Sequence, residues 1–222
     1  MVLLRKVIFD LNGTLVVGEY PSWKYVLEEE LGLERLSERG FGLDDLREVA
    51  RGRLTLKDLI AETFNVKDPE KTVENAVRIY ISKVKLRPEA KRVLSILNEK
   101  YPLILCSDTT GVAREVIRKF NLSTYFRFIF LSCEVGFLKS EEGFWRICLS
   151  RIGCSDPKDF FVVGDSPTTD IYWPRRLGMH TILIETDISS PDNWVEQPKG
   201  LPDEEPEYRI TNLSEVLEIL ES

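Results

Sequence analysis

The strongest constraint on the fold is a set of short apolar runs that do not alternate polar with apolar residues. They are rich in Val, Ile and Phe. Strands that are covered on both faces, as in a parallel sheet, have this composition. We therefore predict buried parallel strands, which lie at residues 6–10, 102–107, 127–132, 160–164 and 181–184.

Helical patterns separate most of these runs and lie at residues 88–99, 112–120, 142–151 and 170–177. Strand–helix alternation favours right-handed crossovers, so we predict an α/β fold with a doubly wound parallel sheet. Residues 187–206 are rich in proline and acids and predict a surface loop. A short strand at 208–211 and a final helix follow it, with Asn212 and Glu215 as a capping box.

One long interruption separates the first two predicted strands and lacks a convincing strand pattern. It contains apolar residues at helical spacing, with breaks near residues 40–42, 52 and 68–69. Four short helices fit this span. We therefore predict two modules, an α/β core of residues 1–16 and 87–222 and a helical cap of residues 17–86.

Composition excludes several classes of function. The 222 residues carry a net charge of −7 without a basic run, which disfavours binding to nucleic acid or anionic membranes. No apolar stretch is long enough to span a membrane, and no signal peptide is recognisable, so we expect a cytoplasmic protein. The four cysteines form no CxxC and accompany a single histidine, His180, which favours free thiols over a zinc site.

Polar residues follow several of the predicted strands. Because ligands bind beyond the carboxyl ends of parallel strands, these residues are expected to meet at one edge of the sheet. They are Asp10, Ser107, Asp108, Asp165 and Asp170, with Lys139 before a helix. Singly, each is the kind of residue that caps helices and forms turns. Jointly, Asp10, Asp165 and Asp170 would repel one another without a cation, and oxygen ligands of this kind suit Mg²⁺.

Four segments carry a resemblance to a known family. "DLNGT", "CSD", the lysine of "VGFLKSEEGFW" and "VGDSPTTDI" resemble, in order and spacing, the motifs of the haloacid dehalogenase superfamily. The predicted helical insert falls where that family places a cap, after the first motif. The resemblance covers nearly the whole chain and implies a Mg²⁺-dependent phosphatase acting on a small phosphorylated substrate.

The resemblance also implies roles for the residues that match its motifs. Asp10 is the nucleophile that forms an aspartyl-phosphate. The Asp10 carboxylate, the main-chain carbonyl of Asn12 and Asp165 hold the metal, with Asp170 as a ligand or a nearby acid. Ser107, beside Asp108, donates to a phosphoryl oxygen, and Lys139 neutralises the charge of the nucleophile and the phosphate.

Asn12 departs from the family pattern, in which most phosphatases carry an aspartate that protonates the leaving group and activates water. An amide cannot do this work, which typically contributes about 10²–10⁴-fold. Three interpretations follow: a slow phosphatase, a phosphate-binding or phosphoryl-accepting protein with little turnover, and a carbon–halogen hydrolase of the 2-haloacid dehalogenase type. A fourth is that Asn12 replaces a natural aspartate. The paired acids Asp165 and Asp170 weigh against the dehalogenase, which the resemblance implies to be metal-independent.

The remaining candidate residues carry weaker functional signals. His180 fits a structural role at the start of the last core strand. The predicted cap offers possible substrate contacts, each of which also fits packing or a solvated surface. They are Tyr20, Trp23, Arg47, Arg51 and Arg53.

Overall fold

The structure, a computed structural model, describes residues 5–17, 23, 25–36, 42–185 and 204–221. In these residues a six-stranded, all-parallel sheet has the order β5-β4-β1-β6-β7-β8. Its strands are β1 (Lys6–Asp10), β4 (Leu103–Ser107), β5 (Phe128–Leu131), β6 (Phe160–Gly164), β7 (His180–Ile184) and β8 (Tyr208–Ile210). The doubly wound α/β prediction is confirmed, and each predicted strand lies within one residue of its observed ends.

The central strand β1 shows why these runs lack alternation. Its residues Val7 and Phe9 pack in one hydrophobic cluster, and Ile8 packs in a second cluster on the opposite face. All three side chains are fully buried. A strand covered on both faces needs apolar residues at every position, so the composition of the run follows from its place in the sheet.

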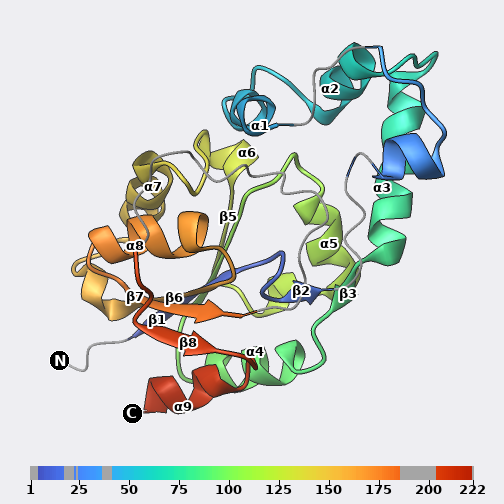
Figure 1. Ribbon diagram of the computed structural model, residues 1–222. Helices are drawn as coiled ribbons and strands as arrows, with labels where there is room; N and C mark the ends of the chain where they lie inside the picture. Colours follow the sequence, from blue (N-terminus) through green and yellow to red (C-terminus); the bar gives the residue numbers. More distant parts are fainter. Residues whose placement is uncertain (1–4, 18–22, 24, 37–41, 186–203, 222) are drawn as a thin grey trace.

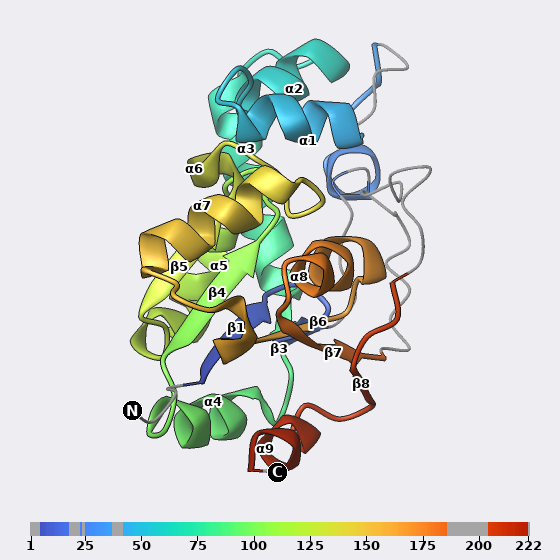
Figure 2. The ribbon, with the colours of Figure 1, turned by 90° about the vertical axis from the view of Figure 1, so that its left-hand side faces the viewer.

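Different helices cover the two faces of the sheet. The first cluster includes residues of α4 (Ala90–Asn98), α5 (Ala113–Phe120) and α9 (Glu215–Glu221). The second cluster includes residues of α7 (Glu142–Ile152) and α8 (Tyr172–Arg176). Figure 2 shows the two groups of helices on opposite sides of the sheet. The predicted helices at 88–99, 112–120 and 142–151 are confirmed with small shifts of their ends.

The sequence patterns did not predict one short helix and misplaced the start of another. The four-residue helix α6 (Ser132–Val135), which ends at Gly136 with a φ of 92°, left no periodic pattern. The predicted helix at 170–177 begins earlier, as a π-helical turn η4 (Pro167–Ile171) that continues into α8. Pro167 stands in its first turn, where proline costs no hydrogen bond, and Ser166 caps it by accepting from Thr169 N at 3.4 Å.

The residues between the first two sheet strands are mainly helical. The described part contains a π-helical turn η1 (Tyr25–Glu30) and helices α1 (Leu43–Ala50), α2 (Leu56–Thr63) and α3 (Pro69–Lys83). Figure 1 shows α1 and α2 at the far end of the molecule from α4 and α9. A separate hydrophobic cluster joins η1, α2 and α3, through residues that include Trp23, Leu27, Ile60 and Ala76.

The prediction of a strand-free insert was wrong at its ends. Val16 and Val17 form β2, which pairs antiparallel with Lys85 and Leu86 of β3. Arg35 and Phe64 also form an isolated antiparallel bridge. Runs of two residues are too short to show a period of two, so the sequence could not reveal them. The ribbon of β2 and β3 brings together the two ends of the insert.

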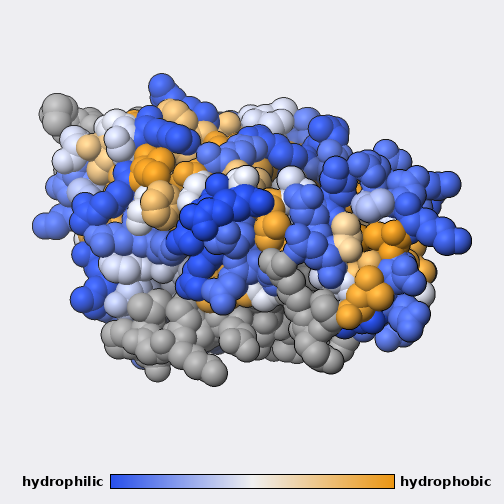
Figure 3. Space-filling view, turned by 90° about the horizontal axis from the view of Figure 1, so that it is seen from above, coloured by the Kyte–Doolittle hydropathy of each residue, from blue (hydrophilic) through white to orange (hydrophobic). Residues whose placement is uncertain are grey.

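The surface seen from above is mostly hydrophilic, with hydrophobic residues in separate small groups (Figure 3). The large hydrophobic residues exposed in the described part are Tyr25, Leu36 and Phe137. In the same part of the chain, no helix is both long and apolar enough to cross a membrane.

Candidate active site

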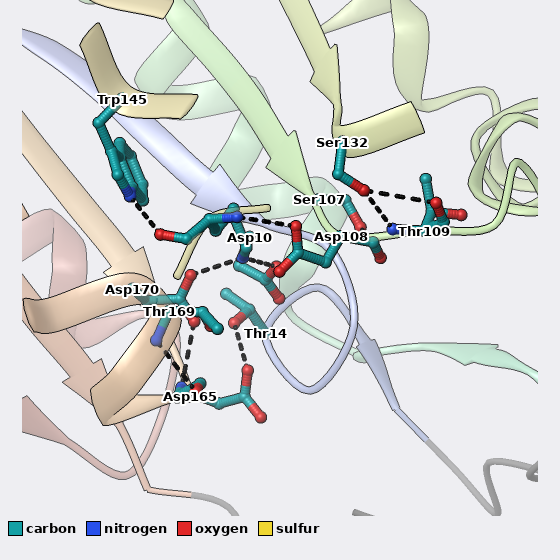
Figure 4. Close-up of polar contacts among 12 residues, drawn as sticks. Asp10, Thr14, Ser107, Asp108, Thr109, Ser132, Trp145, Asp165, Thr169 and Asp170 are labelled. Carbon is teal, nitrogen blue, oxygen red and sulfur yellow. Dashed lines mark hydrogen bonds and ion pairs between the residues drawn. The ribbon is translucent and has the colours of Figure 1, made fainter. Parts of the chain in front are cut away.

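The strand order places three polar strand ends side by side. β1 lies between β4 and β6, so Asp10, Asp108 and Asp165 leave the sheet at one edge. Figure 4 shows these carboxylates directed into the same region, together with Asp170 from η4. The expectation that the scattered acids meet at the carboxyl ends of the strands is confirmed.

Three aspartates lie close enough together to share a cation. One carboxylate oxygen from each of Asp10, Asp165 and Asp170 lies within 4.8 Å of the other two. Asp10 and Asp170 are buried, whereas Asp165 is partly accessible. These three aspartates are the one group of three or more His, Cys, Asp or Glu side chains in the described residues that could hold a metal ion. The four cysteines are free thiols, as predicted.

Lys139 lies between two of these acids. Its Nζ is 2.5 Å from Asp10 Oδ1 and 2.6 Å from Asp170 Oδ1, and its side chain is 3% exposed. Burial alone pushes the pKa of Lys139 down, but Asp10, Asp170 and Asp108 outweigh it and raise the pKa well above its ordinary value. The lysine is therefore a fixed positive charge beside the Asp10 carboxylate.

Burial also shapes the titration of the acids. It raises the pKa of Asp10 well above the ordinary value, against the opposing charge of Lys139. Desolvation and the neighbouring Asp170 raise the pKa of Asp165 to about 7. Burial raises the pKa of Asp108 to about 6. An additional cation at this edge would favour the charged form of each acid.

Two observations indicate that the cluster fits a hard divalent ion such as Mg²⁺. Asp10 Oδ2 and Asn12 Oδ1 are buried without a hydrogen-bond partner among the described residues. Unpartnered buried oxygens of this kind are costly and call for an ion, water or ligand. The donors of the cluster are all carboxylate oxygens, which suit Mg²⁺ better than softer metals.

The π-helical turn η4 fixes the orientation of Asp170. Ser166 N donates to Asp170 Oδ2 at 3.1 Å, while the other carboxylate oxygen faces Lys139. The Asp170 amide donates to Ser166 O at 2.9 Å. π-Helical turns occur often at functional sites, and here the turn directs Asp170 into the cluster.

Position 13 requires glycine because the Asp165 carboxylate lies against its Cα. Its φ is 84°, and a Cβ at this position would lie 2.0 Å from Asp165 Oδ2.

We expect Gly13→Ala to displace Asp165 and to strain the backbone, with a cost of about 1–3 kcal/mol in unfolding free energy. Isothermal titration with Mg²⁺ and a thermal melt measure the two effects. Gly32→Ala, where φ is 61° with no atom within 4 Å, is the control for backbone strain alone. Unchanged Mg²⁺ affinity in Gly13→Ala would contradict the predicted contact.

The polar residues of the "CSD" motif form hydrogen bonds to the protein backbone. Ser107 Oγ donates to Asp108 O at 3.3 Å, and Asp108 Oδ1 accepts from Lys139 N at 2.9 Å. Asp108 thus holds the backbone of the lysine. The predicted substrate contacts of Ser107, Asp108 and Lys139 stay predictions, as do the metal-binding roles of Asp10, Asn12, Asp165 and Asp170.

The predicted substrate contacts of the insert mostly have partners nearby. Trp23 stacks on Tyr80 with ring centroids 5.3 Å apart. Arg47 pairs with Asp44 at 2.8 Å, and Arg53 pairs with Glu48 at 3.1 Å. Arg51 pairs with Glu48 at 3.6 Å and with Glu141, which precedes α7, at 3.4 Å. Tyr20 lies outside the described residues. His180 stacks on Phe161 and pairs with Glu207 at 2.8 Å, in keeping with a structural role.

Sequence reasoning missed the residues that support the site. Thr14 Oγ1 donates to Asp165 Oδ1 at 3.4 Å. Arg87 donates to the carbonyls of Gly13 and Thr14 at 2.8 and 2.9 Å and thereby holds the turn after Asp10. The indoles of Trp145 and Trp173 donate to the carbonyls of Lys139 and Ser140, each at 2.8 Å. The contacts of Arg87, Trp145 and Trp173 end on backbone atoms, whereas that of Thr14 ends on a carboxylate. Only Thr14, inside the "DLNGT" motif, carried a sequence signal.

The profile of the haloacid dehalogenase-like hydrolases matches residues 4–178, which is more than half of the chain. The chain therefore belongs to the family of haloacid dehalogenase-like hydrolases, as its motifs implied. It is 28% identical over 134 residues to a phosphoserine phosphatase from Thermus thermophilus, a stretch that covers 59% of this chain. The matched stretch spans about half of that relative, 49% of its length.

Solved structures share the fold over nearly the whole chain. A phosphatase from Thermococcus onnurineus has a TM-score of 0.68 at 22% identity, with 98% of each chain covered. A 2-haloacid dehalogenase from Pseudomonas syringae has a TM-score of 0.64 at 21% identity, again with 98% of each chain covered. A family enzyme from Bacteroides thetaiotaomicron, in complex with magnesium and inorganic phosphate, has a TM-score of 0.68 at 20% identity, with 84% and 96% covered. The fold is thus common to phosphatases and a dehalogenase, and the choice between them depends on the site.

Proposed function

We propose that this hydrolase is a Mg²⁺-dependent phosphatase that cleaves small phosphate monoesters through an aspartyl-phosphate on Asp10. The observation that carries the proposal is the cluster of Asp10, Asp165 and Asp170 with Lys139 between two of its members. A carboxylate that approaches a phosphate dianion is repelled unless positive charge accompanies it. The cluster offers a place for a divalent cation, and Lys139 supplies a second positive charge.

Each residue then has a distinct task. Asp10 attacks phosphorus, an oxygen–phosphorus bond forms, and the bond to the leaving oxygen breaks with its electron pair. Lys139 offsets the negative charge of nucleophile and phosphoryl group, and Ser107 donates to a phosphoryl oxygen. Asp165, Asp170 and the carbonyl of Asn12 join Asp10 in holding Mg²⁺. When bound, the ion draws charge from the phosphoryl oxygens and aligns the ester with the nucleophile.

The cluster weighs against one alternative, and hydrolysis of an ester separates the proposal from the other. A carbon–halogen hydrolase of this family is expected to need no metal, so paired acids and unpartnered oxygens at the site would have no use. A phosphate-binding protein without turnover agrees with the amide at Asn12 but predicts no hydrolysis from any ester. The similarity to a phosphoserine phosphatase supports the phosphatase and suggests a small substrate with a charged leaving group.

A panel of aryl, acyl and alkyl phosphates, assayed with Mg²⁺ and with EDTA, tests the proposal. We expect Mg²⁺-dependent phosphate release, fastest from aryl and acyl phosphates, because good leaving groups depart without a proton. Halide release from 2-haloacids in the presence of EDTA, without phosphate release, would point instead to the dehalogenase. Asp10→Asn is the control for activity that does not arise at this site.

The pKa of Asp165 predicts how Mg²⁺ changes thermal stability with pH. Burial raises this pKa from 3.8 to about 7, so the metal-free folded protein binds more protons than the unfolded chain between these values. Its stability therefore falls as the pH rises through this window. Mg²⁺ binds deprotonated carboxylates and reverses the loss. We expect the Mg²⁺-induced rise in Tm to be small at about pH 5 and to grow up to about pH 8.

Differential scanning fluorimetry with and without Mg²⁺ measures this dependence. Asp165→Asn is the control, because it removes both the raised pKa and one predicted ligand. A Mg²⁺-induced rise in Tm that is as large at about pH 5 as at about pH 8 would contradict the assignment of Asp165 to the metal site.

A further inference from the structure

The backbone around Lys139 is held from several directions although it has no regular secondary structure. Lys139 lies in a turn between α6 and α7. Its amide donates to Asp108 Oδ1 at 2.9 Å, and its carbonyl accepts from Trp145 Nε1 at 2.8 Å. The carbonyl of the next residue, Ser140, accepts from Trp173 Nε1 at 2.8 Å. Three backbone polar groups of these two successive residues thus bond to side chains from other elements.

This arrangement matters because a lysine ammonium is a compact charge on a flexible four-carbon stem. Lys139 Nζ contacts both Asp10 and Asp170, so a shift of its Cα would change both distances together. Reactive groups must be held within a fraction of an ångström of the productive geometry by the residues around them. A turn whose peptide planes are fixed provides that restraint, whereas a free turn does not.

The two indoles come from different helices on the same face of the sheet. Trp145 belongs to α7 and is fully buried, and Trp173 belongs to α8 and packs against the same cluster. A single buried indole N–H commonly finds some acceptor, which would be plain packing. Here two indoles bond to the carbonyls of two successive residues, which fixes the orientation of both peptide planes.

We propose that Trp145 and Trp173 are positioning residues for Lys139, and that their indole N–H groups hold the Lys139–Ser140 turn against α7 and α8. The two tryptophans act through the backbone of the turn and do not touch the reacting atoms. The kinetic consequence rests on the proposed phosphatase function. The structural consequence, a turn that loosens when the N–H groups are lost, does not depend on it.

Trp145→Phe, Trp173→Phe and the double variant remove the N–H groups but keep aromatic rings. The matched control is Phe144→Leu, which reduces a fully buried side chain of the same helix and cluster without removing a bond to the turn. All variants are compared at equal distance below their own Tm. Hydrogen–deuterium exchange of residues 136–141 reports the turn, and acylation of Lys139 relative to exposed Lys91 reports access to the lysine.

We expect faster exchange and severalfold greater acylation of Lys139 in the tryptophan variants but not in Phe144→Leu. On the best phosphate ester, kcat falls by about 10²-fold in the double variant, the typical cost of misplacing a reacting group by about 1 Å, while KM stays within about twofold. Unchanged exchange and acylation in the double variant overturn the proposal, as does an equal loss of kcat in Phe144→Leu. If the turn loosens but the wild type hydrolyses no ester, the proposed function fails while the positioning role stands.

Discussion

Asn12→Asp should raise turnover of alkyl phosphates by about 10²–10⁴-fold, the usual contribution of general acid–base catalysis. The side-chain oxygen Asn12 Oδ1 is buried without a partner in the described residues. A carboxyl group in that place would be desolvated, and desolvation raises the pKa of an acid. It would therefore hold a proton near neutral pH, for the leaving oxygen, and then accept one from the attacking water.

The gain should depend on the leaving group. Alkyl oxygens need a proton to depart, whereas aryl and acyl phosphates leave readily without one, so the latter should gain less from the substitution. In the wild type, slow attack of water should let the aspartyl-phosphate accumulate. Mg²⁺ affinity should change little, because the predicted ligand at this position is the main-chain carbonyl.

Steady-state assays of alkyl and aryl phosphates with purified wild type and variant measure the effect. Asn12→Ala is the control, since it keeps the main-chain carbonyl but supplies no acid and should show no gain. An Asn12→Asp variant no faster than wild type on any ester would contradict the proposed acid–base role of position 12. An equal gain from Asn12→Ala and from Asn12→Asp would attribute the gain to loss of the amide group, not to the new acid.

Lys139→Met should lower kcat sharply and also destabilise the protein. Removal of one preorganised charge-stabilising group typically costs about 10²–10³-fold in kcat. The lysine also neutralises Asp10 and Asp170, which are buried. Removing one partner of a buried ion pair typically costs about 3–5 kcal/mol in unfolding free energy, because the remaining charges are left uncompensated.

The loss of stability in Lys139→Met should depend on pH and on the neighbouring acids. Lys139 lowers the pKa of Asp10, so without the lysine this pKa rises further in the folded state. The variant is therefore most stable at acid pH and weakens as the pH increases. Urea unfolding at about pH 5 and pH 8 measures this slope. Asp170→Asn in the Lys139→Met background should restore part of the stability at about pH 8. A stability loss independent of pH would contradict the assigned charge balance.

The sheet was predictable because its inner strands β1, β4, β6 and β7 are buried on both faces. Runs such as residues 7–9 and Phe160–Gly164 need apolar residues at every position, and that requirement is visible in the sequence alone. The two-residue strands β2 and β3 and the four-residue helix α6 were not predictable. Elements this short do not repeat their period, and tertiary pairing, not local propensity, decides them.

The candidate site was predictable in its residues but not in its support. Asp10, Asp165 and Asp170 follow strands, and the topology of a parallel sheet brings strand ends to one edge. The positions of Trp145, Trp173 and Arg87 carried no comparable signal, because each donates to a main-chain carbonyl that any residue possesses. Asp108 follows a strand as expected, yet its contact with Lys139 N depends on how a distant turn packs.

The central claim is that Asp10 accepts a phosphoryl group in the presence of Mg²⁺. The most direct measurement incubates the protein with an aryl or acyl phosphate and Mg²⁺, quenches in acid, and reduces the product with borohydride, which converts an aspartyl-phosphate into homoserine. Peptide mass spectrometry then locates the modified residue. The account predicts homoserine at position 10, dependent on Mg²⁺ and formed much more slowly in Lys139→Met. Ester hydrolysis with no modification at Asp10, or modification at another residue, would contradict it.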